Sequence, residues 1–290
     1  MVKTTVQFQE VGFTYPSLQT NPRPALSGID LTMESGQVTA IIGQTGSGKT
    51  TLMQLLAGLQ SPQQGQIKRN EVIIDRQATS KQLDQWRQGI GYVFQFPEKQ
   101  LFAETVLDDV MFGPLNLGLS KADARQRAIK SLQQVKVNPK LFDQSPFELS
   151  GGQQRRVAIA GVLAMQPQVL ILDEPSVGLD PKGQHELVEL IQTCQQQEML
   201  IVMITHDMEL VAQVANQVVV LTEGKVATIT TPRELFEQAE QLATWQLSLP
   251  TAVQLAYLAR QSGAQLQPLP LTMEQLATQL ATELEGHDAN

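Results

Sequence analysis

The chain has 290 residues, of which 42% are apolar and 17% are charged, so it can bury a sizeable core and wholesale disorder is excluded. Its formal net charge of -8 argues against a nucleic-acid partner, because such partners are usually met by a basic face. Cys194 is the single cysteine, so no internal disulfide can form. We expect no secretion signal and no membrane span, because no apolar run approaches the roughly 20 residues that cross a bilayer. A partner would have to supply any membrane span.

Strands and helices alternate along most of the chain. Alternating polar and apolar residues predict a half-buried strand at 4–11, and a continuous apolar run predicts a buried strand at 38–42. A helix is expected at 50–59 and a mostly helical stretch at 97–149. Further strands are expected at 66–75, in an antiparallel layer, and at 169–172, 199–204, 218–221 and 225–229. This alternation predicts a mostly parallel sheet covered on both faces.

A glycine-rich segment follows the first buried strand and matches the pattern Gly-x4-Gly-Lys-Thr. Its glycines let consecutive backbone N–H groups curl around phosphate oxygens, and the following helix points its positive end at the same anion. Lys49 would neutralise the outer phosphates, and the Thr50 hydroxyl could bind Mg²⁺. A turn without a ligand is the alternative, but the strand before and the helix after favour a phosphate site. The predicted ATP-binding residues here are Gly43, Gln44, Thr45, Gly46, Ser47, Gly48, Lys49, Thr50 and Thr51.

Two acidic residues, Asp173 and Glu174, follow the apolar run 169–172. A carboxylate at the carboxyl end of a parallel strand lies at the edge of the sheet where ligands bind. Asp173 would hold Mg²⁺, directly or through water, and Glu174 would act as general base on the attacking water. Solvated acids at a strand end are the alternative. Behind a phosphate loop we favour the catalytic interpretation.

The segment 149–153 reads Leu-Ser-Gly-Gly-Gln, and phosphate-loop chemistry within one chain does not require it. A helix with a serine N-cap and ordinary glycines would also explain the residues. The segment is identical to the signature motif of ATP-binding cassette (ABC) proteins. From about residue 6 to residue 224 the chain resembles this family, which implies ATP and Mg²⁺ as cofactors.

In ABC proteins two such domains pack head to tail, and each signature faces the ATP that the other domain holds. The resemblance therefore implies that the signature contacts the ATP of a partner subunit. A serine hydroxyl, bare glycine N–H groups and a helix N-terminus are all suited to a γ-phosphate. The residues concerned are Ser150, Gly151, Gly152 and Gln153.

The resemblance assigns four more positions. His206, after the strand at 199–204, matches the switch histidine that contacts the γ-phosphate, and Asp180 lies in the segment that resembles the D-loop. Tyr15 would stack on adenine, and Gln95 would bind Mg²⁺ and water. An ordinary turn at Asp180, a core tyrosine and an ordinary loop glutamine are the alternatives.

The sequence changes character after residue 230. Thr231 followed by proline predicts a helix start, Pro250 would open another helix that Gly263 ends, and Thr272 with Gln275 fits a capping box. We expect this tail to pack on the main domain or on a partner, because it is short for a free-standing fold.

The predicted fold class is α/β, a phosphate-loop NTPase of ABC type. A RecA-like, mostly parallel core would carry an antiparallel β subdomain, a helical subdomain and a small α-rich domain at the C-terminus. We expect the nucleotide-binding domain to cover 1–229, with the helical subdomain at about 97–156. The accessory or dimer-contact domain would cover 230–290.

The segment 96–102 and the tail resemble the ATPases of energy-coupling-factor (ECF) transporters, in particular the second type of their ATPase pair. The resemblance implies an ATP hydrolase on the cytoplasmic side of the cell membrane, as a peripheral protein. ATP-driven closure of its dimer would drive uptake of vitamins or other micronutrients. The implied partners are a second, homologous ABC ATPase, a membrane-embedded coupling subunit and a substrate-binding membrane subunit.

Two other functions stay open: the ATPase of another ABC importer or exporter, and a soluble ABC protein that acts on ribosomes or DNA. The second is disfavoured because the chain has one cassette, no long heptad stretch and no basic patch. A phosphate-loop kinase would not need the segment 149–153.

Overall fold

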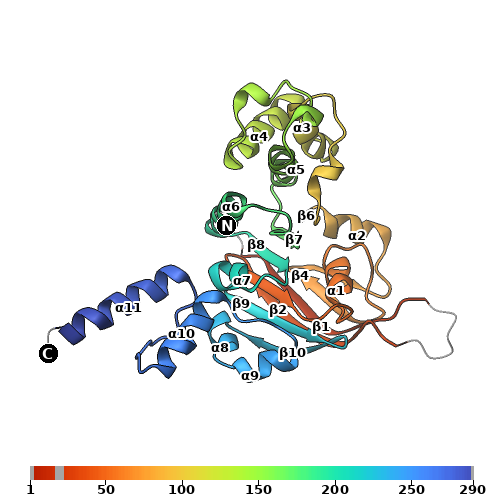
Figure 1. The fold of residues 1–290 in the computed structure, drawn as a ribbon. Helices are drawn as coiled ribbons and strands as arrows, with labels where there is room; N and C mark the ends of the chain where they lie inside the picture. The colour runs from red at the N-terminus through yellow and green to blue at the C-terminus, as the bar shows by residue number, and fades with distance from the viewer. Residues whose placement is uncertain (1–2, 17–22, 289–290) are drawn as a thin grey trace.

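The chain folds around two β-sheets (Figure 1), and the computed structural model describes residues 3–16 and 23–288. The larger sheet has the strand order β10-β9-β3-β8-β7-β6 and is parallel except for β10, which runs antiparallel to β9. The predicted mostly parallel sheet is confirmed. Its strands are β3 (Val38–Ile42), β6 (Ile90–Val93), β7 (Val169–Asp173), β8 (Leu200–Ile204), β9 (Gln217–Thr222) and β10 (Lys225–Thr230).

The smaller sheet is antiparallel, as expected, but the single strand predicted at 66–75 is wrong. The chain turns back at Asn70, whose φ is 52°, and Arg69 pairs with Val72 across a hairpin. Asparagine tolerates the left-handed backbone, so it makes a turn inside an otherwise strand-like run. The strands, in the order β2-β1-β4-β5, are β1 (Thr5–Phe13), β2 (Leu26–Glu34), β4 (Gln64–Arg69) and β5 (Val72–Asp75).

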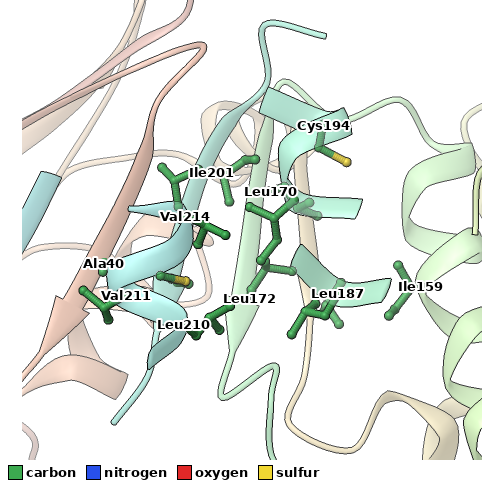
Figure 2. Close-up of a cluster of buried hydrophobic side chains, with 14 of the residues drawn as sticks. Ala40, Ile159, Leu170, Leu172, Leu187, Cys194, Ile201, Leu210, Val211 and Val214 are labelled. Atoms are coloured by element: carbon green, nitrogen blue, oxygen red, sulfur yellow. The ribbon is translucent and has the colours of Figure 1, made fainter. Parts of the chain in front are cut away.

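Side chains of the buried strands alternate between two hydrophobic cores. In β3, Ala40 and Ile42 point into one core and Ile41 into the other. The second core lies against α1 (Lys49–Leu56) and the antiparallel sheet. Because these strands are buried on both faces, they read as continuous apolar runs. Figure 2 shows the first core, where strand side chains meet those of α6 (Pro181–Gln196) and α7 (Met208–Val214): Leu170, Leu172, Ile201, Leu187, Cys194, Leu210, Val211 and Val214.

The stretch between β6 and β7 forms a helical lobe, which stands above the sheet in Figure 1. The predicted helical character of 97–149 is confirmed, although short 3-10 turns that begin with proline interrupt it. Ile159 of α5 joins this lobe to the first core, where it faces Leu187 of α6 (Figure 2). The elements are η1 (Pro97–Gln100), α3 (Val106–Asn116), α4 (Lys121–Gln134), η2 (Pro139–Leu141), η3 (Pro146–Glu148) and α5 (Gly151–Ala164).

The C-terminal tail is helical and packs against α7. The Thr251 N–H donates to Oε1 of Glu209 at 2.6 Å, and the Tyr257 hydroxyl donates to the Phe236 carbonyl at 2.9 Å. Apolar side chains of the tail continue the first core rather than forming a separate one. In Figure 1 the last helix extends away from the body of the protein. The helices are α8 (Pro232–Phe236), α9 (Ala239–Thr244), α10 (Thr251–Gln261) and α11 (Met273–Asp288).

The helix starts expected in the tail are confirmed, with one correction. Thr231 caps α8 in a full capping box. At α11 only half of the predicted box forms. The Thr272 hydroxyl accepts from the Gln275 N–H at 3.3 Å, but the Gln275 side chain accepts from the Leu271 N–H, one residue too early. Within 3–16 and 23–288 no helix has the length and apolarity needed to cross a bilayer.

Candidate functional site

The phosphate loop connects β3 to α1 and has a backbone that depends on glycine. Gly43 has a φ of 142°, and a Cβ at this position would lie 2.2 Å from the Leu221 carbonyl oxygen. No side chain other than hydrogen fits there. Nζ of Lys49 donates to the carbonyls of Gly43 and Gln44, at 2.6 and 2.9 Å. The lysine therefore lies folded over the loop whose ligand it would bind.

Two features of the loop fit a phosphate. The hydroxyl of Ser47 is buried and has no hydrogen-bond partner. It could therefore donate a hydrogen bond to a phosphate oxygen. The N-cap of α1 is Gly48, which offers no side-chain bond to the first N–H groups of the helix. These donors and the helix dipole favour an anion. Burial lowers the pKa of Lys49, while Glu174 and then Asp173 raise it.

Strand register brings the loop and the acidic pair to one edge of the sheet. Ile41 of β3 and Asp173 of β7 both pair with Ile204 of β8. The carboxyl ends of parallel strands point the same way, so the residues that follow these three strands converge. This register brings the segments that carry Lys49, Asp173 and His206 to one edge of the sheet.

Asp173 lies half-buried beside an aromatic residue that the sequence did not single out. The Tyr92 hydroxyl, on β6, donates to Oδ2 of Asp173 at 3.0 Å. The pKa of Asp173 is raised overall, chiefly by burial. The hydrogen bond from Tyr92 lowers this pKa, the charge of Glu174 raises it, and the charge of Lys49 lowers it. Burial, with the Asp173 charge and bond, also raises the pKa of Tyr92. The Asp173 carboxylate and the hydroxyl of Thr50, the residue after Lys49, are hard oxygen donors of the kind that Mg²⁺ prefers, so these residue types fit this ion.

Glu174 and His206 are in direct contact. Oε2 of Glu174 lies 2.9 Å from Nδ1 of His206 and 3.4 Å from its backbone nitrogen. The backbone of Glu174 is left-handed, with a φ of 46°, and its N–H donates to the Ile204 carbonyl at 2.9 Å. Such strain persists only where the surroundings impose it, and it is common at active sites. The Glu174 side chain is 18% exposed and that of His206 is 75% exposed, so the pair opens to solvent on the histidine side.

The signature opens α5 with a complete capping box. The Ser150 hydroxyl accepts from the Gln153 N–H at 3.4 Å, and the Gln153 side chain accepts from the Ser150 N–H at 2.9 Å. A Cβ on Gly151 or Gly152 would meet nothing within 4 Å. Packing within this chain therefore does not require either glycine.

Two hollows lie near these motifs. One, of about 480 Å³, is lined by Ser150 and Gly152 and by Asp180, which caps α6 through a 2.7 Å bond from the Gly183 N–H. Among the described residues that line it, none belongs to the phosphate loop. The other, of about 390 Å³, borders the phosphate loop from Gln44 to Ser47. The signature and the phosphate loop thus face different spaces.

Tyr15 and Gln95 lie at the surface near the loop. The Tyr15 hydroxyl donates to Oε1 of Gln54 at 2.9 Å and lies 3.2 Å from the hydroxyl of Thr51, both on α1. The tyrosine is 43% exposed, so it is not a core residue. Gln95 is exposed and follows β6, whose last residue, Val93, pairs with Leu172. Tyr15 therefore lies beside the helix that follows the phosphate loop. Gln95 follows the strand that pairs with β7, which ends at Asp173.

The fold and this site define a phosphate-loop ATPase with an ABC signature. A family model described as "ABC transporter" matches residues 26–177. The "Energy-coupling factor transporter ATP-binding protein EcfA2" of Streptococcus thermophilus is 46% identical over 93% of this chain and 96% of its own. The protein of that name in Latilactobacillus sakei is 47% identical over 96% of each chain. The chain therefore belongs to the ABC transporter family and, within it, to the energy-coupling factor transporter ATP-binding proteins.

Solved structures agree with this assignment. CbiO1 from Clostridium perfringens, described as part of the ABC transporter complex cbiONQ, superposes with a TM-score of 0.73 at 36% identity, over 88% of this chain and 98% of that one. The dimeric cassette MJ0796 bound to ADP and Pi superposes with a TM-score of 0.68 at 28% identity, over 79% and 99%. The predicted ABC fold, the ATP-hydrolase activity and the resemblance to ECF ATPases are confirmed.

Proposed function

We propose that this chain is one half of a dimer that encloses two ATP molecules and drives an ECF-type importer. The observation that carries the proposal is the separation of two motifs that would hold one γ-phosphate. The phosphate loop opens α1 beside the sheets, whereas the signature opens α5 in the helical lobe (Figure 1). A second subunit is needed to bring a signature to the ATP at Lys49. The dimeric state of the MJ0796 cassette supports this arrangement.

Within this chain, each predicted residue has one role. Lys49 and the loop N–H groups bind the phosphates, and Tyr15 stacks on adenine. Thr50, Gln95 and Asp173 would hold Mg²⁺, which neutralises phosphate charge when bound. Glu174 takes the proton of the attacking water. The contact between Glu174 and His206, described above, supports a shared role in orienting that water.

Toward the second subunit, Ser150 to Gln153 donate to the γ-phosphate of the partner's ATP. Asp180, which lines the same hollow as the signature, would lie at the seam between the two sites. These contacts exist only in the closed dimer, so ATP shifts the population toward closure. Loss of phosphate removes them and the dimer reopens. The partner ATPase is a close homologue, as expected for a paired ECF ATPase.

An exposed aromatic surface supports docking to a membrane subunit. Five phenylalanines between residues 94 and 147 are each at least 40% exposed, and the rings of Phe102 and Phe112 are 4.8 Å apart. We infer that the five contribute to one surface, which we call the aromatic surface: Phe94, Phe96, Phe102, Phe112 and Phe147. Exposed apolar patches of this kind mark protein interfaces. The surface borders Gln95, so a helix seated there would lie beside the ATP site. We infer that the protein lies peripherally on the cytoplasmic side of the cell membrane. A membrane-embedded coupling subunit would contact the aromatic surface. A separate membrane subunit would bind the substrate, a vitamin or another micronutrient.

We also infer the domain division expected from the sequence. The nucleotide-binding domain would cover 1–229, with a helical subdomain at about 97–156, and an accessory or dimer-contact domain would cover 230–290. The succession of α8 to α11 after β10, which ends at Thr230, supports a boundary close to residue 229.

Photolabelling tests the head-to-tail arrangement. The complex is purified from membranes with Ser150→Arg in this chain, labelled with azido-ATP, and each ATPase subunit is separated and quantified. We expect the partner's ATP site to lose label while the site at Lys49 of this chain keeps it. Ser120→Arg, at another exposed helix N-cap in the same lobe, is the matched control. Selective loss of label at Lys49 would refute the arrangement, as would full ATP turnover by a strictly monomeric form.

A further inference from the structure

A buried arginine in the signature helix bonds to the loop that carries Glu174 and Asp180. Arg155 lies five residues after Ser150 and is only 8% exposed. Nη1 donates to the Val177 carbonyl at 2.9 Å, and Nη2 donates to the Pro175 carbonyl. Neither bond is explained by the capping of α5, because the Ser150 box satisfies the helix start on its own.

The geometry of these bonds fixes the position of the loop. Pro175 directly follows Glu174 in the chain, and Val177 lies two residues further on. Two bonds from one planar guanidinium to alternate carbonyls hold this short segment in both position and orientation. Any displacement of α5 relative to the sheet is therefore passed to the loop between β7 and α6. That loop begins at Glu174 and ends at Asp180.

A buried carboxylate from the segment beside the aromatic surface influences the same arginine electrostatically. Glu98 lies in η1, which packs against α5. Its Oε2 is buried without a hydrogen-bond partner. Burial lowers the pKa of Arg155, and the charge of Glu98 counteracts this effect, which places the two groups within electrostatic reach. On the outer side of the same turn, the Lys99 ammonium lies 4.6 Å from the centre of the Phe96 ring.

We propose that Arg155 is a positioning residue for ATP hydrolysis, and that Glu98 is the group through which the segment 94–102 acts on it. This inference rests on the proposed function of Glu174 and of the aromatic surface. A partner bound to the aromatic surface would shift η1 and so change the electrostatic interaction between Glu98 and Arg155. Arg155 would pass this change to the loop that carries Glu174. Neither residue needs to touch the nucleotide.

A double-mutant cycle tests the relay, with kcat and KM for ATP measured separately on the complex purified from membranes. Arg155→Lys keeps the charge but cannot reach both carbonyls, and we expect kcat to fall about tenfold, as for the loss of one hydrogen bond. Glu98→Gln is isosteric and should lower kcat about threefold, with KM for ATP within about twofold in each variant. Because both residues act in one relay, the double variant should lose about tenfold rather than about thirtyfold.

Controls separate this inference from the function on which it rests. Glu104→Gln, at an exposed acid just beyond the segment 94–102, should leave kcat unchanged. Glu174→Gln should abolish turnover; if it does not, the proposed function itself is wrong. If Glu174→Gln behaves as expected but Arg155→Lys turns over like the wild type, or raises KM alone, the positioning role is refuted. Additive losses in the double variant would refute the relay through Glu98. If Arg155→Lys does not fold, a wild-type kcat for Glu98→Gln would still refute the relay through Glu98.

Discussion

Ser150 caps α5 in this structure, and its proposed contact with a γ-phosphate can be tested separately from that cap. Its hydroxyl caps α5 through the Gln153 N–H, at 3.4 Å, and we propose that it also donates to a γ-phosphate on the partner subunit. Loss of an N-cap serine costs about 1 kcal/mol, which lowers the midpoint of thermal unfolding by about 2–4 °C in a chain of this size. Loss of a hydrogen bond to a charged group costs about 1.5–3 kcal/mol, or roughly 10- to 150-fold in rate.

Two substitutions distinguish these costs. Ser150→Ala removes both roles, so we expect the small loss of stability and the large loss of ATP turnover. Ser150→Asn keeps the cap, because asparagine caps as well as serine. It should therefore unfold at nearly the wild-type temperature and still lose turnover, since its larger side chain cannot replace the hydroxyl at the phosphate.

A matched control is available in the same lobe. Ser120 caps α4 by accepting from the Asp123 N–H at 3.2 Å, and it is exposed like Ser150. Ser120→Ala should cost the same stability and leave ATP turnover unchanged. Thermal unfolding and steady-state phosphate release on the same preparations measure both quantities. If Ser150→Ala loses no more turnover than Ser120→Ala, the signature acts only as a helix cap and the dimeric site is wrong.

Four further predictions concern stability and reactivity. Burial raises the pKa of the Cys194 thiol to about 12, so the thiol stays protonated well above the usual range; iodoacetamide should modify it only after unfolding, as mass spectrometry would detect. Trp86→Phe removes the 2.7 Å bond to the Leu56 carbonyl and leaves that buried group unpaired, which should cost about 1–3 kcal/mol in urea unfolding. Gly65→Ala would place a Cβ 2.2 Å from a carbonyl oxygen of β1 at a φ of 69°, and should lower stability by at least about 2 kcal/mol. Gly161→Ala, inside α5 with open space around it, should instead raise stability by about 0.5–1 kcal/mol. If Gly65→Ala and Gly161→Ala change the free energy of unfolding equally, both glycine predictions are wrong.

The elements that the sequence predicts best are those buried on both faces. β3, β7 and β8 are nearly continuous apolar runs, and each leads into a chemical motif, so both their type and their position can be read from residues alone. β6 is harder, because it has four residues and contains Gly91, where a Cβ would lie 2.6 Å from a side chain of α5. The strand depends on that tertiary contact. Because β6 was not predicted, Tyr92, the hydrogen-bond partner of Asp173, was also missed.

The residues of the site could be named from motifs, but their contacts could not. The bond between Glu174 and His206 depends on the register of β7 against β8, and motifs carry no information on register. Arg155 follows the signature directly, yet the carbonyls that it bonds lie about 20 residues further along the chain. A buried arginine so near a helix start is a usable signal, since arginine is rarely buried without partners.

The contacts of Lys49 and Ser47 bear on how much of the ATP-binding energy is free to close a dimer. Nζ of Lys49 is already held by two loop carbonyls, and the buried Ser47 hydroxyl is held by none. If phosphate oxygens bind here as we propose, the lysine would exchange neutral acceptors for charged ones and the serine would gain a bond, so both changes would favour binding. The loop backbone need not move for either, because Gly43 is fixed against the Leu221 carbonyl. A preorganised loop spends little of the binding energy on its own ordering. More of that energy would then remain for the proposed closure of the dimer, in which the signature of a second subunit binds the γ-phosphate.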